Sequence, residues 1–291
     1  MVNEKEKKGL NRNEFLKLSA IGTTVIAGTN IGGDILTATE RTEDIETAKK
    51  VGRRWAFIID LDRCIGCKAC AIACKVEFDT RLGLFMSQVI YYEYGEYPNT
   101  KRNFLPWLCN HCEYPPCING CPVEPIDAEF NGIRFKKKAT YKRPDGVVMV
   151  DEDRCIGCGL CIQNCPYNVR FFDPEKKGGA NPDTNHASKC DLCVHILDAG
   201  VVPCCVNTCP ARARLIGDLN DPNSEVSRLL KRDKAEVLLP EKGTKPHVFY
   251  IGKYKKRINK GLKKGEDIRI EANSEYQIKV WKEGPYYKGT L

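Results

Sequence analysis

Four repeated cysteine groups constrain this chain more than any other feature of its sequence. The chain has 291 residues and 17 cysteines, a share far above that of an ordinary enzyme. Sixteen of them form the groups Cys64-x2-Cys67-x2-Cys70-x3-Cys74, Cys109-x2-Cys112-x4-Cys117-x3-Cys121, Cys155-x2-Cys158-x2-Cys161-x3-Cys165 and Cys190-x2-Cys193-x11-Cys205-x3-Cys209. Thiols at such short intervals require the chain to wrap closely around what they bind. We therefore expect a fold organised around these groups.

The first and third groups have the spacing of bacterial ferredoxins, in which cysteines hold [4Fe–4S] cubanes. In that pattern three cysteines of one loop bind one cubane, and the fourth binds the neighbouring cubane. Proline follows the last cysteine of three groups, as Pro122, Pro166 and Pro210, whereas Lys75 follows Cys74. Because proline suits the first position of a helix, we expect the last cysteine to open a helix.

A repeat in the sequence supports the same interpretation. Residues 62–67 and 153–158 both read Asp-Arg-Cys-Ile-Gly-Cys. Their glycine permits a positive φ and a close approach of the backbone to a bound group. Strand-like apolar runs precede both copies, at residues 55–59 and 146–150. A strand, a cysteine loop and a short helix make up half of a ferredoxin module.

Zinc sites and disulfide bonds are the alternatives for the cysteines. Zinc sites use two C-x2-C pairs for each metal, and the further cysteines of these groups do not fit that pattern. Disulfide frameworks are typical of small secreted chains, and these cysteines are too close in sequence to pair within a group. Cys204 stands outside the groups, because Cys205 has the x3 interval to Cys209. We expect Cys204 to be a small buried residue or a spare thiol.

The charge balance of the chain is basic. It has 46 Lys and Arg against 38 Asp and Glu, a formal net charge of +8. Such a charge is typical of proteins that bind nucleic acid or anionic membranes. Four cubanes with their thiolates carry about −2 each and would neutralise it. We therefore expect no nucleic-acid partner; the alternative is a zinc module that binds nucleic acid through the basic runs 136–138 and 255–257.

The first 50 residues differ from the rest of the chain. A charged stretch, residues 1–17, precedes the uncharged residues 18–33, which are too few to span a bilayer. This is the layout of a signal peptide. Residues 11–17, Asn-Arg-Asn-Glu-Phe-Leu-Lys, resemble the twin-arginine export motif with Asn13 in place of its second arginine. We expect residues 1–50 to be a degraded twin-arginine-like signal or, alternatively, an N-terminal helix.

Three segments outside the cysteine groups carry weaker signals. Tyrosines such as Tyr91 and Tyr97, within residues 76–108, indicate a packing or partner surface. Residues 166–189 contain a Lys-Lys-Gly-Gly run and predict an exposed insertion. Asp221 and Pro222 precede an apolar pattern and predict the start of a helix in residues 221–230.

The four groups, in this order, resemble the four-cluster ferredoxin-type beta subunits of the dimethyl-sulfoxide reductase family of molybdoenzymes. The resemblance covers residues 54–252, and residues 108–112, 213–222, 239–244 and 246–252 are most similar to its tetrathionate reductase branch. It implies an α+β fold of two interleaved ferredoxin-like modules, loop-rich, with short strands and helices around four [4Fe–4S] clusters. A domain at 51–252 would combine an outer module, from motifs 64–74 and 190–209, with an inner module at about 105–170. A basic extension, 253–291, would follow it.

The resemblance also implies which cysteines share a cluster. In the family each motif gives three cysteines to one cluster and its last cysteine to the cluster of a partner motif, first with fourth and second with third. Carried onto this chain, the sets are Cys64, Cys67, Cys70 and Cys209 (site 1), Cys74, Cys190, Cys193 and Cys205 (site 2), Cys109, Cys112, Cys117 and Cys165 (site 3), and Cys121, Cys155, Cys158 and Cys161 (site 4).

The sequence contains no phosphate-binding loop, dinucleotide fingerprint or nucleophile–base pair. We therefore expect an electron-transfer subunit of an oxidoreductase complex and no catalytic residues in the chain itself. The resemblance implies two partners, an integral membrane anchor subunit that oxidises quinol and a molybdopterin catalytic subunit of an anaerobic respiratory reductase. The reductase would be of the tetrathionate, thiosulfate, polysulfide or arsenate type, membrane-associated through its partners on the periplasmic or extracytoplasmic face. The alternative is a cytoplasm-facing electron-transfer subunit of a formate dehydrogenase or hydrogenase complex.

Overall fold

The computed structural model describes residues 52–94, 97–99 and 101–253 of the chain. The expected signal or helix in residues 1–50, and all of the basic extension after Lys253, lie outside these residues. Within the described part, no helix has the length and apolar character needed to cross a membrane.

A three-stranded sheet has β1 (Trp55–Asp60) at its centre. β10 (Arg214–Asp218) runs antiparallel to β1 on one side, and β11 (Val248–Ile251) runs parallel to it on the other. Phe57 and Ile59 pack into the largest core cluster, together with buried cysteines, whereas Ala56 and Ile58 pack on the opposite side against Val226. Because side chains alternate along a strand, β1 joins the cysteine core to the helix that carries Val226.

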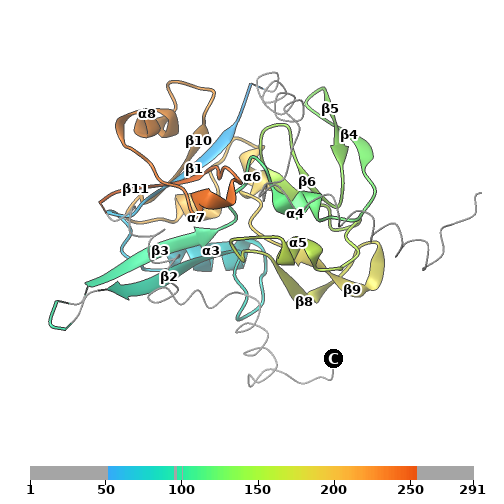
Figure 1. Cartoon of the computed structure of the whole chain (residues 1–291), viewed down its shortest axis with the longest axis horizontal. Coiled ribbons are helices and arrows are strands. Elements are labelled where there is room, and N and C mark those ends of the chain that lie inside the picture. Colours follow the sequence, from blue (N-terminus) through green and yellow to red (C-terminus); the bar gives the residue numbers. More distant parts are fainter. Residues whose placement is uncertain (1–51, 95–96, 100, 254–291) are drawn as a thin grey trace, which may run out of the picture. The chain divides into compact units, whose positions relative to one another are not determined.

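That helix is α8 (Glu225–Arg232), which lies beside β10 and β1 (Figure 1). Ser224 caps it by accepting a hydrogen bond from the Ser227 N–H at 3.1 Å. Such a cap satisfies one of the free N–H groups at a helix start. The prediction of a helix in this segment is confirmed, with its first residue four positions after Asp221.

Four two-stranded hairpins complete the β-structure of the described residues (Figure 1). They are β2 (Ser87–Tyr94) with β3 (Lys101–Leu108), β4 (Ile126–Phe130) with β5 (Ile133–Lys137), β6 (Thr140–Lys142) with β7 (Val148–Val150), and β8 (Phe171–Gly178) with β9 (Asn181–Ser188). The strands predicted ahead of the two repeats are confirmed as β1 and β7. Short strands and short helices joined by loops agree with the predicted α+β fold class.

The helices next to the cysteines differ from the prediction at one point. They are α3 (Ala69–Glu77) and the one-turn helices α4 (Pro116–Asn119), α5 (Leu160–Gln163), α6 (Val194–Leu197) and α7 (Cys204–Asn207). The expectation that the last cysteine of a group opens a helix is wrong, because Cys121, Cys165 and Cys209 each follow the end of one. Proline disfavours the helical conformation of the residue before it, so these helices end before Cys121, Cys165 and Cys209. Lys75 removes that restriction, and α3 continues to Glu77.

The prediction of an exposed insertion at residues 166–189 is also wrong. The segment forms the β8–β9 hairpin, and Phe171, Ala187 and Ser188 at its base are buried. The polar tip suggested a loop, but the residues at its base pack into the cores.

The two tyrosines expected to form a packing or partner surface differ in their surroundings. The Tyr91 hydroxyl donates a hydrogen bond to the Gly66 carbonyl at 2.9 Å, whereas Tyr97 is 94% exposed.

Gly66 and Gly157 occupy equivalent positions in the two repeats, and both have a φ of 69°. A Cβ atom at Gly66 would lie 2.3 Å from the Phe104 ring, and one at Gly157 would lie 2.8 Å from the Asn185 carbonyl oxygen. Both backbone conformation and packing therefore require glycine in each cysteine loop.

We predict that Gly157→Ala destabilises the holoprotein more than Gly132→Ala does. Both glycines have positive φ, but a Cβ atom at Gly132 meets nothing within 4 Å. Gly132→Ala should therefore cost only the backbone strain of about 1–2 kcal/mol, while Gly157→Ala must also displace the backbone at Asn185. Thermal unfolding midpoints and bound iron of the two variants measure the difference. Equal effects would contradict the role of packing at Gly157.

Candidate metal centres

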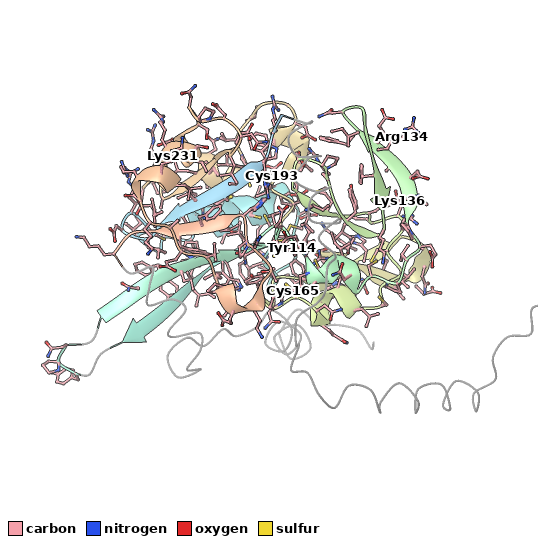
Figure 2. All side chains as sticks on the ribbon, turned by 45° about the horizontal axis from the view of Figure 1, so that its top comes forward. Tyr114, Arg134, Lys136, Cys165, Cys193 and Lys231 are labelled. Carbon is pink, nitrogen blue, oxygen red and sulfur yellow. The ribbon has the colours of Figure 1, made fainter. Side chains whose placement is uncertain are left out.

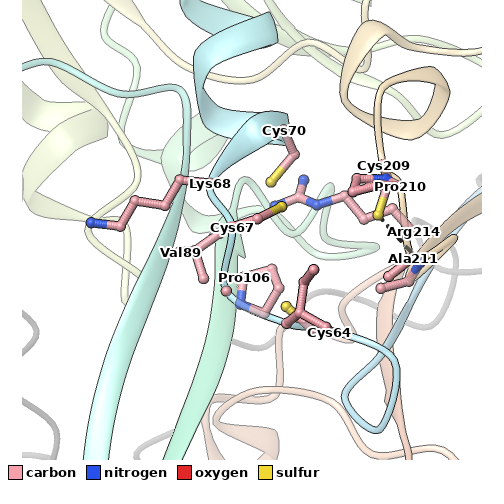
Figure 3. A pocket seen from close by; sticks show the side chains of 13 residues that line it. Cys64, Cys67, Lys68, Cys70, Val89, Pro106, Cys209, Pro210, Ala211 and Arg214 are labelled. Atoms are coloured by element: carbon pink, nitrogen blue, oxygen red, sulfur yellow. Dashed lines mark hydrogen bonds between the residues drawn. The ribbon is translucent and has the colours of Figure 1, made fainter.

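Site 1 is a pocket into which four thiols project (Figure 3). Cys64 and Cys67 come from the loop after β1, Cys70 lies in the first turn of α3, and Cys209 follows α7. Its empty space, including the open mouth, is about 340 Å³. The structure thus brings two segments about 140 residues apart in sequence to one pocket.

Backbone and cationic groups surround the thiols of site 1. The Ala213 N–H donates a hydrogen bond to Cys209 Sγ at 3.3 Å. Burial raises the pKa of the Cys64 thiol, and a hydrogen bond from the Gly66 backbone opposes this rise. Arg214 lines the same pocket (Figure 3). Donors placed in this way stabilise negative charge on sulfur.

Site 3 is a second four-thiol pocket, with an empty space of about 300 Å³. Its thiols come from Cys109 and Cys112 after β3, from Cys117 in α4 and from Cys165 after α5. Arg170 Nη2 donates a hydrogen bond to Cys117 Sγ at 3.1 Å.

Site 4 has an empty space of about 290 Å³. Cys155 and Cys158 lie on the loop after β7, and Cys161 lies in α5. Cys121, just beyond α4, completes the pocket. The pockets of sites 3 and 4 therefore each combine three cysteines of one group with the last cysteine of the other.

Site 2 gathers five thiols rather than four. Cys74 from α3, Cys190 and Cys193 around the start of α6, and Cys205 in α7 are all buried. Burial, then the charge of Cys205, raises the pKa of Cys190. Cys204 joins them, with its Sγ 3.7 Å from that of Cys193. The sequence predicted a small buried residue or a spare thiol, and the structure places Cys204, half-buried, at the edge of site 2.

Most of the cysteines are buried, and several cationic side chains lie at the surface. In Figure 2, Cys165 and Cys193 lie inside the molecule, while Arg134, Lys136 and Lys231 lie at its periphery. These three cationic side chains are exposed. The run at residues 136–138 therefore includes an exposed lysine, Lys136, which forms an ion pair with Asp127 at 2.8 Å.

The buried thiols suit the binding of a positively charged metal group. Burial is the main cause that raises the pKa of Cys117 and of Cys205 to about 11 each. A thiol must lose its proton to become a metal ligand, and a bound cationic core would favour the thiolate against the effect of burial. In addition, Arg214 Nη2 is buried and has no hydrogen-bond partner among the described residues. The donor sets and this free N–H suit the sulfur-rich surface of an iron–sulfur cluster.

Thiols of different sites interact with one another. Cys70 of site 1 and Cys205 of site 2 interact with each other's charge, and Cys109 of site 3 raises the pKa of Cys190 of site 2 after burial and nearer charges. Cys117 and Cys161, from sites 3 and 4, both face Arg170. The two exposed cysteines are Cys67 and Cys158, in sites 1 and 4.

Arg170 and Arg214 are residues that the sequence analysis missed. Each is the fifth residue after the last cysteine of its group, Cys165 or Cys209. This shared offset was visible in the sequence, but a lone arginine outside a cysteine motif did not suggest a role beside the thiols.

Comparison with known proteins agrees with this geometry. Two family models match, both described as 4Fe-4S dicluster domains, at residues 56–122 and 100–219. Two dicluster domains correspond to four [4Fe–4S] clusters. The prediction of four [4Fe–4S] clusters as cofactors is therefore confirmed.

Several curated proteins are similar over most of their length. The chain is 43% identical over 203 residues to a tetrathionate reductase subunit of Salmonella typhimurium, covering 68% of this chain and 72% of that protein. It is 36% identical over 238 residues to the arsenate respiratory reductase iron–sulfur subunit of a Shewanella species, covering 68% and 96%. It is also 36% identical over 223 residues to a selenate reductase subunit of Mesobacillus selenatarsenatis, covering 68% and 72%. The chain therefore belongs to the ferredoxin-type 4Fe–4S subunits of the dimethyl-sulfoxide reductase family, the electron-transfer subunits of oxidoreductase complexes.

Proposed function

We propose that the chain carries single electrons through four clusters in the order of sites 1 to 4, between a membrane subunit that oxidises quinol and a molybdopterin catalytic subunit. The observation that supports this proposal is the set of thiol sites inside the molecule, in which thiols of different sites interact and only Cys67 of site 1 and Cys158 of site 4 are exposed. Because electron transfer through protein slows steeply with distance, closely spaced carriers let electrons cross a chain of this size.

The sixteen cysteines are the proposed ligands, in the four sets given above. Each bound cluster supplies a one-electron carrier whose potential depends on burial, charge and hydrogen bonds to sulfur. The chain's own residues hold the thiols in place: α3 positions Cys70 and Cys74 four residues apart, so that they serve sites 1 and 2. The last cysteine of each group ties its segment to a partner segment.

Sites 1 and 4, the two ends of the proposed order, are the proposed docking surfaces for the partner subunits. Beside the exposed Cys67, Ile65 is 61% exposed, and beside the exposed Cys158, Ile156 is 38% exposed. Exposed apolar side chains around a redox site suit a partner that must approach closely. Both ends are needed, because an electron-transfer subunit has one donor and one acceptor.

We propose a respiratory reductase of the tetrathionate, thiosulfate, polysulfide or arsenate type, with the tetrathionate type supported by the 43% identity to a tetrathionate reductase subunit. Substrate specificity belongs to the catalytic subunit. The twin-arginine-like residues 11–17 support a position on the extracytoplasmic face, reached in complex with the partners. A cytoplasm-facing subunit of a formate dehydrogenase or hydrogenase complex is the alternative.

The native complex tests this function. Purified from membranes through a tag on this chain, it should contain a large molybdenum-binding subunit and an integral membrane subunit. It should also oxidise quinol to quinone when tetrathionate is added as the electron acceptor. Formate- or hydrogen-dependent reduction of the same clusters, without tetrathionate turnover, would support the alternative and contradict the proposal.

The cluster content of the isolated subunit provides a second prediction. Anaerobically prepared protein should contain about sixteen iron and about sixteen acid-labile sulfide per chain, since each of four sites has a complete set of thiols. Chemical analysis and EPR spectroscopy measure this. About twelve iron, or a three-iron signal before any oxidation, would mean that one set is incomplete.

Site 2 offers a matched pair of variants. Cys205→Ala should lose or convert one cluster, because Cys205 is the buried thiol that has the x3 interval to Cys209 and interacts with Cys190. Cys204→Ala should keep all four clusters, although Cys204 Sγ lies 3.7 Å from Cys193 Sγ. EPR spin counts and iron content compare the two. Cluster loss in the Cys204 variant, or four intact clusters in the Cys205 variant, would show that the assignment is wrong.

A further inference from the structure

We propose that Arg170 and Arg214 are equivalent positioning residues, each of which holds one positive charge between two adjacent clusters and raises the reduction potential of both. Arg214 serves sites 1 and 2, and Arg170 serves sites 3 and 4. The inference rests on the proposed electron transfer and adds a determinant of its energetics, located in this chain's own side chains.

The two arginines are related by the internal repeat. Each follows the last cysteine of its group by five residues, and each is only 2% exposed. Arg170 directly precedes β8, and Arg214 is the first residue of β10. Two separate parts of the chain thus each place a buried arginine at an equivalent position beside their cysteine sites.

Arg170 reaches both sites of the second and third cysteine groups. Its Nη2 donates a hydrogen bond to Cys117 Sγ of site 3 at 3.1 Å, and its Nη1 donates to Thr140 Oγ1 at 3.3 Å. Thr140 lines site 4, and Arg170 itself lines site 3. The charge of the guanidinium group also acts on Cys161 of site 4, where it opposes the rise in pKa that burial causes.

Arg214 has the corresponding place beside the first and fourth groups. It lines site 1 (Figure 3), and its charge acts on Cys70 of site 1 and on Cys205 of site 2. Nη1 donates a hydrogen bond to Ser87 Oγ at 3.0 Å. Nη2 is buried without a partner among the described residues, so one N–H remains to donate to cluster sulfur.

Neither guanidinium group has a carboxylate as its counter-ion within the part of the chain that the structure describes. Arg143 provides the contrast, since this buried arginine forms ion pairs with Asp145 at 2.6 Å and Asp198 at 2.8 Å. A buried charge without a partner is costly. The negative clusters with their thiolates are therefore the counter-ions of Arg170 and Arg214.

The sign of the effect follows from electrostatics. Reduction adds one negative charge to a cluster, and a nearby positive charge favours the reduced form. Because interactions between buried charges are only weakly screened, each arginine should act on both clusters next to it. The interaction falls with distance, so each arginine should act only slightly on the distant pair. Removal of the charge should therefore lower two of the four potentials.

The test is an EPR-monitored redox titration of the intact complex with Arg170→Met or Arg214→Met. In each variant two midpoint potentials should shift to lower values, and the two affected pairs should not overlap. Arg170→Lys and Arg214→Lys keep a cation and should recover much of the shift. Arg228→Met removes the same charge from an exposed position on α8 and should leave all four potentials unchanged.

The possible results separate this inference from the proposed function. Four clusters with unchanged potentials in the Met variants would overturn the inference while electron transfer stands. The inference would also fail if the Lys variants shifted as far as the Met variants. If a Met variant loses its clusters, the Lys variant decides: a full cluster complement with small shifts in one pair supports the inference, and shifts spread over all four potentials overturn it. A wild-type chain without four clusters would instead contradict the function itself.

Discussion

The burial of cysteine thiols in the core is the constraint on which the rest of this structure depends. Cysteines make up four of the seven buried members of one core cluster, namely Cys117, Cys121, Cys155 and Cys161. The largest core cluster also contains cysteines from all four groups. These positions would normally be filled by apolar side chains that pack on one another. Here they line pockets, so with the proposed ligand sets the free energy of cluster binding would add to the free energy of folding.

Much of the site could be predicted from the sequence because cysteine spacing reports local geometry directly. The loops after β1 and β7, with Gly66 and Gly157 at a φ of 69°, follow from a six-residue repeat. The strands before them follow from apolar runs. Such features depend on neighbouring residues, and the chain needs no distant contact to specify them.

Most features that the sequence did not predict depend on tertiary packing. The β8–β9 hairpin looked like an insertion because its tip is polar, while its buried base depends on contacts with the cysteine core. The role of Arg170 and Arg214 can be recognised only when cysteine groups that are distant in sequence come together around them. The place of Cys204 beside Cys193 likewise depends on how α6 and α7 approach each other. One local rule was also misapplied, since proline after Cys121, Cys165 and Cys209 ends a helix instead of starting one.

The exchange of last cysteines between groups has a consequence for biosynthesis. With the proposed ligand sets, the inner module is nested within the outer one along the chain. Sites 3 and 4 have all their ligands once synthesis has passed Cys165, whereas site 1 stays open until Cys209 has been added. A nascent chain can thus complete its two inner clusters first, and the outer pair closes around a centre that already exists. Iron content of chains truncated between Cys165 and Cys190 would show whether the inner pair forms independently.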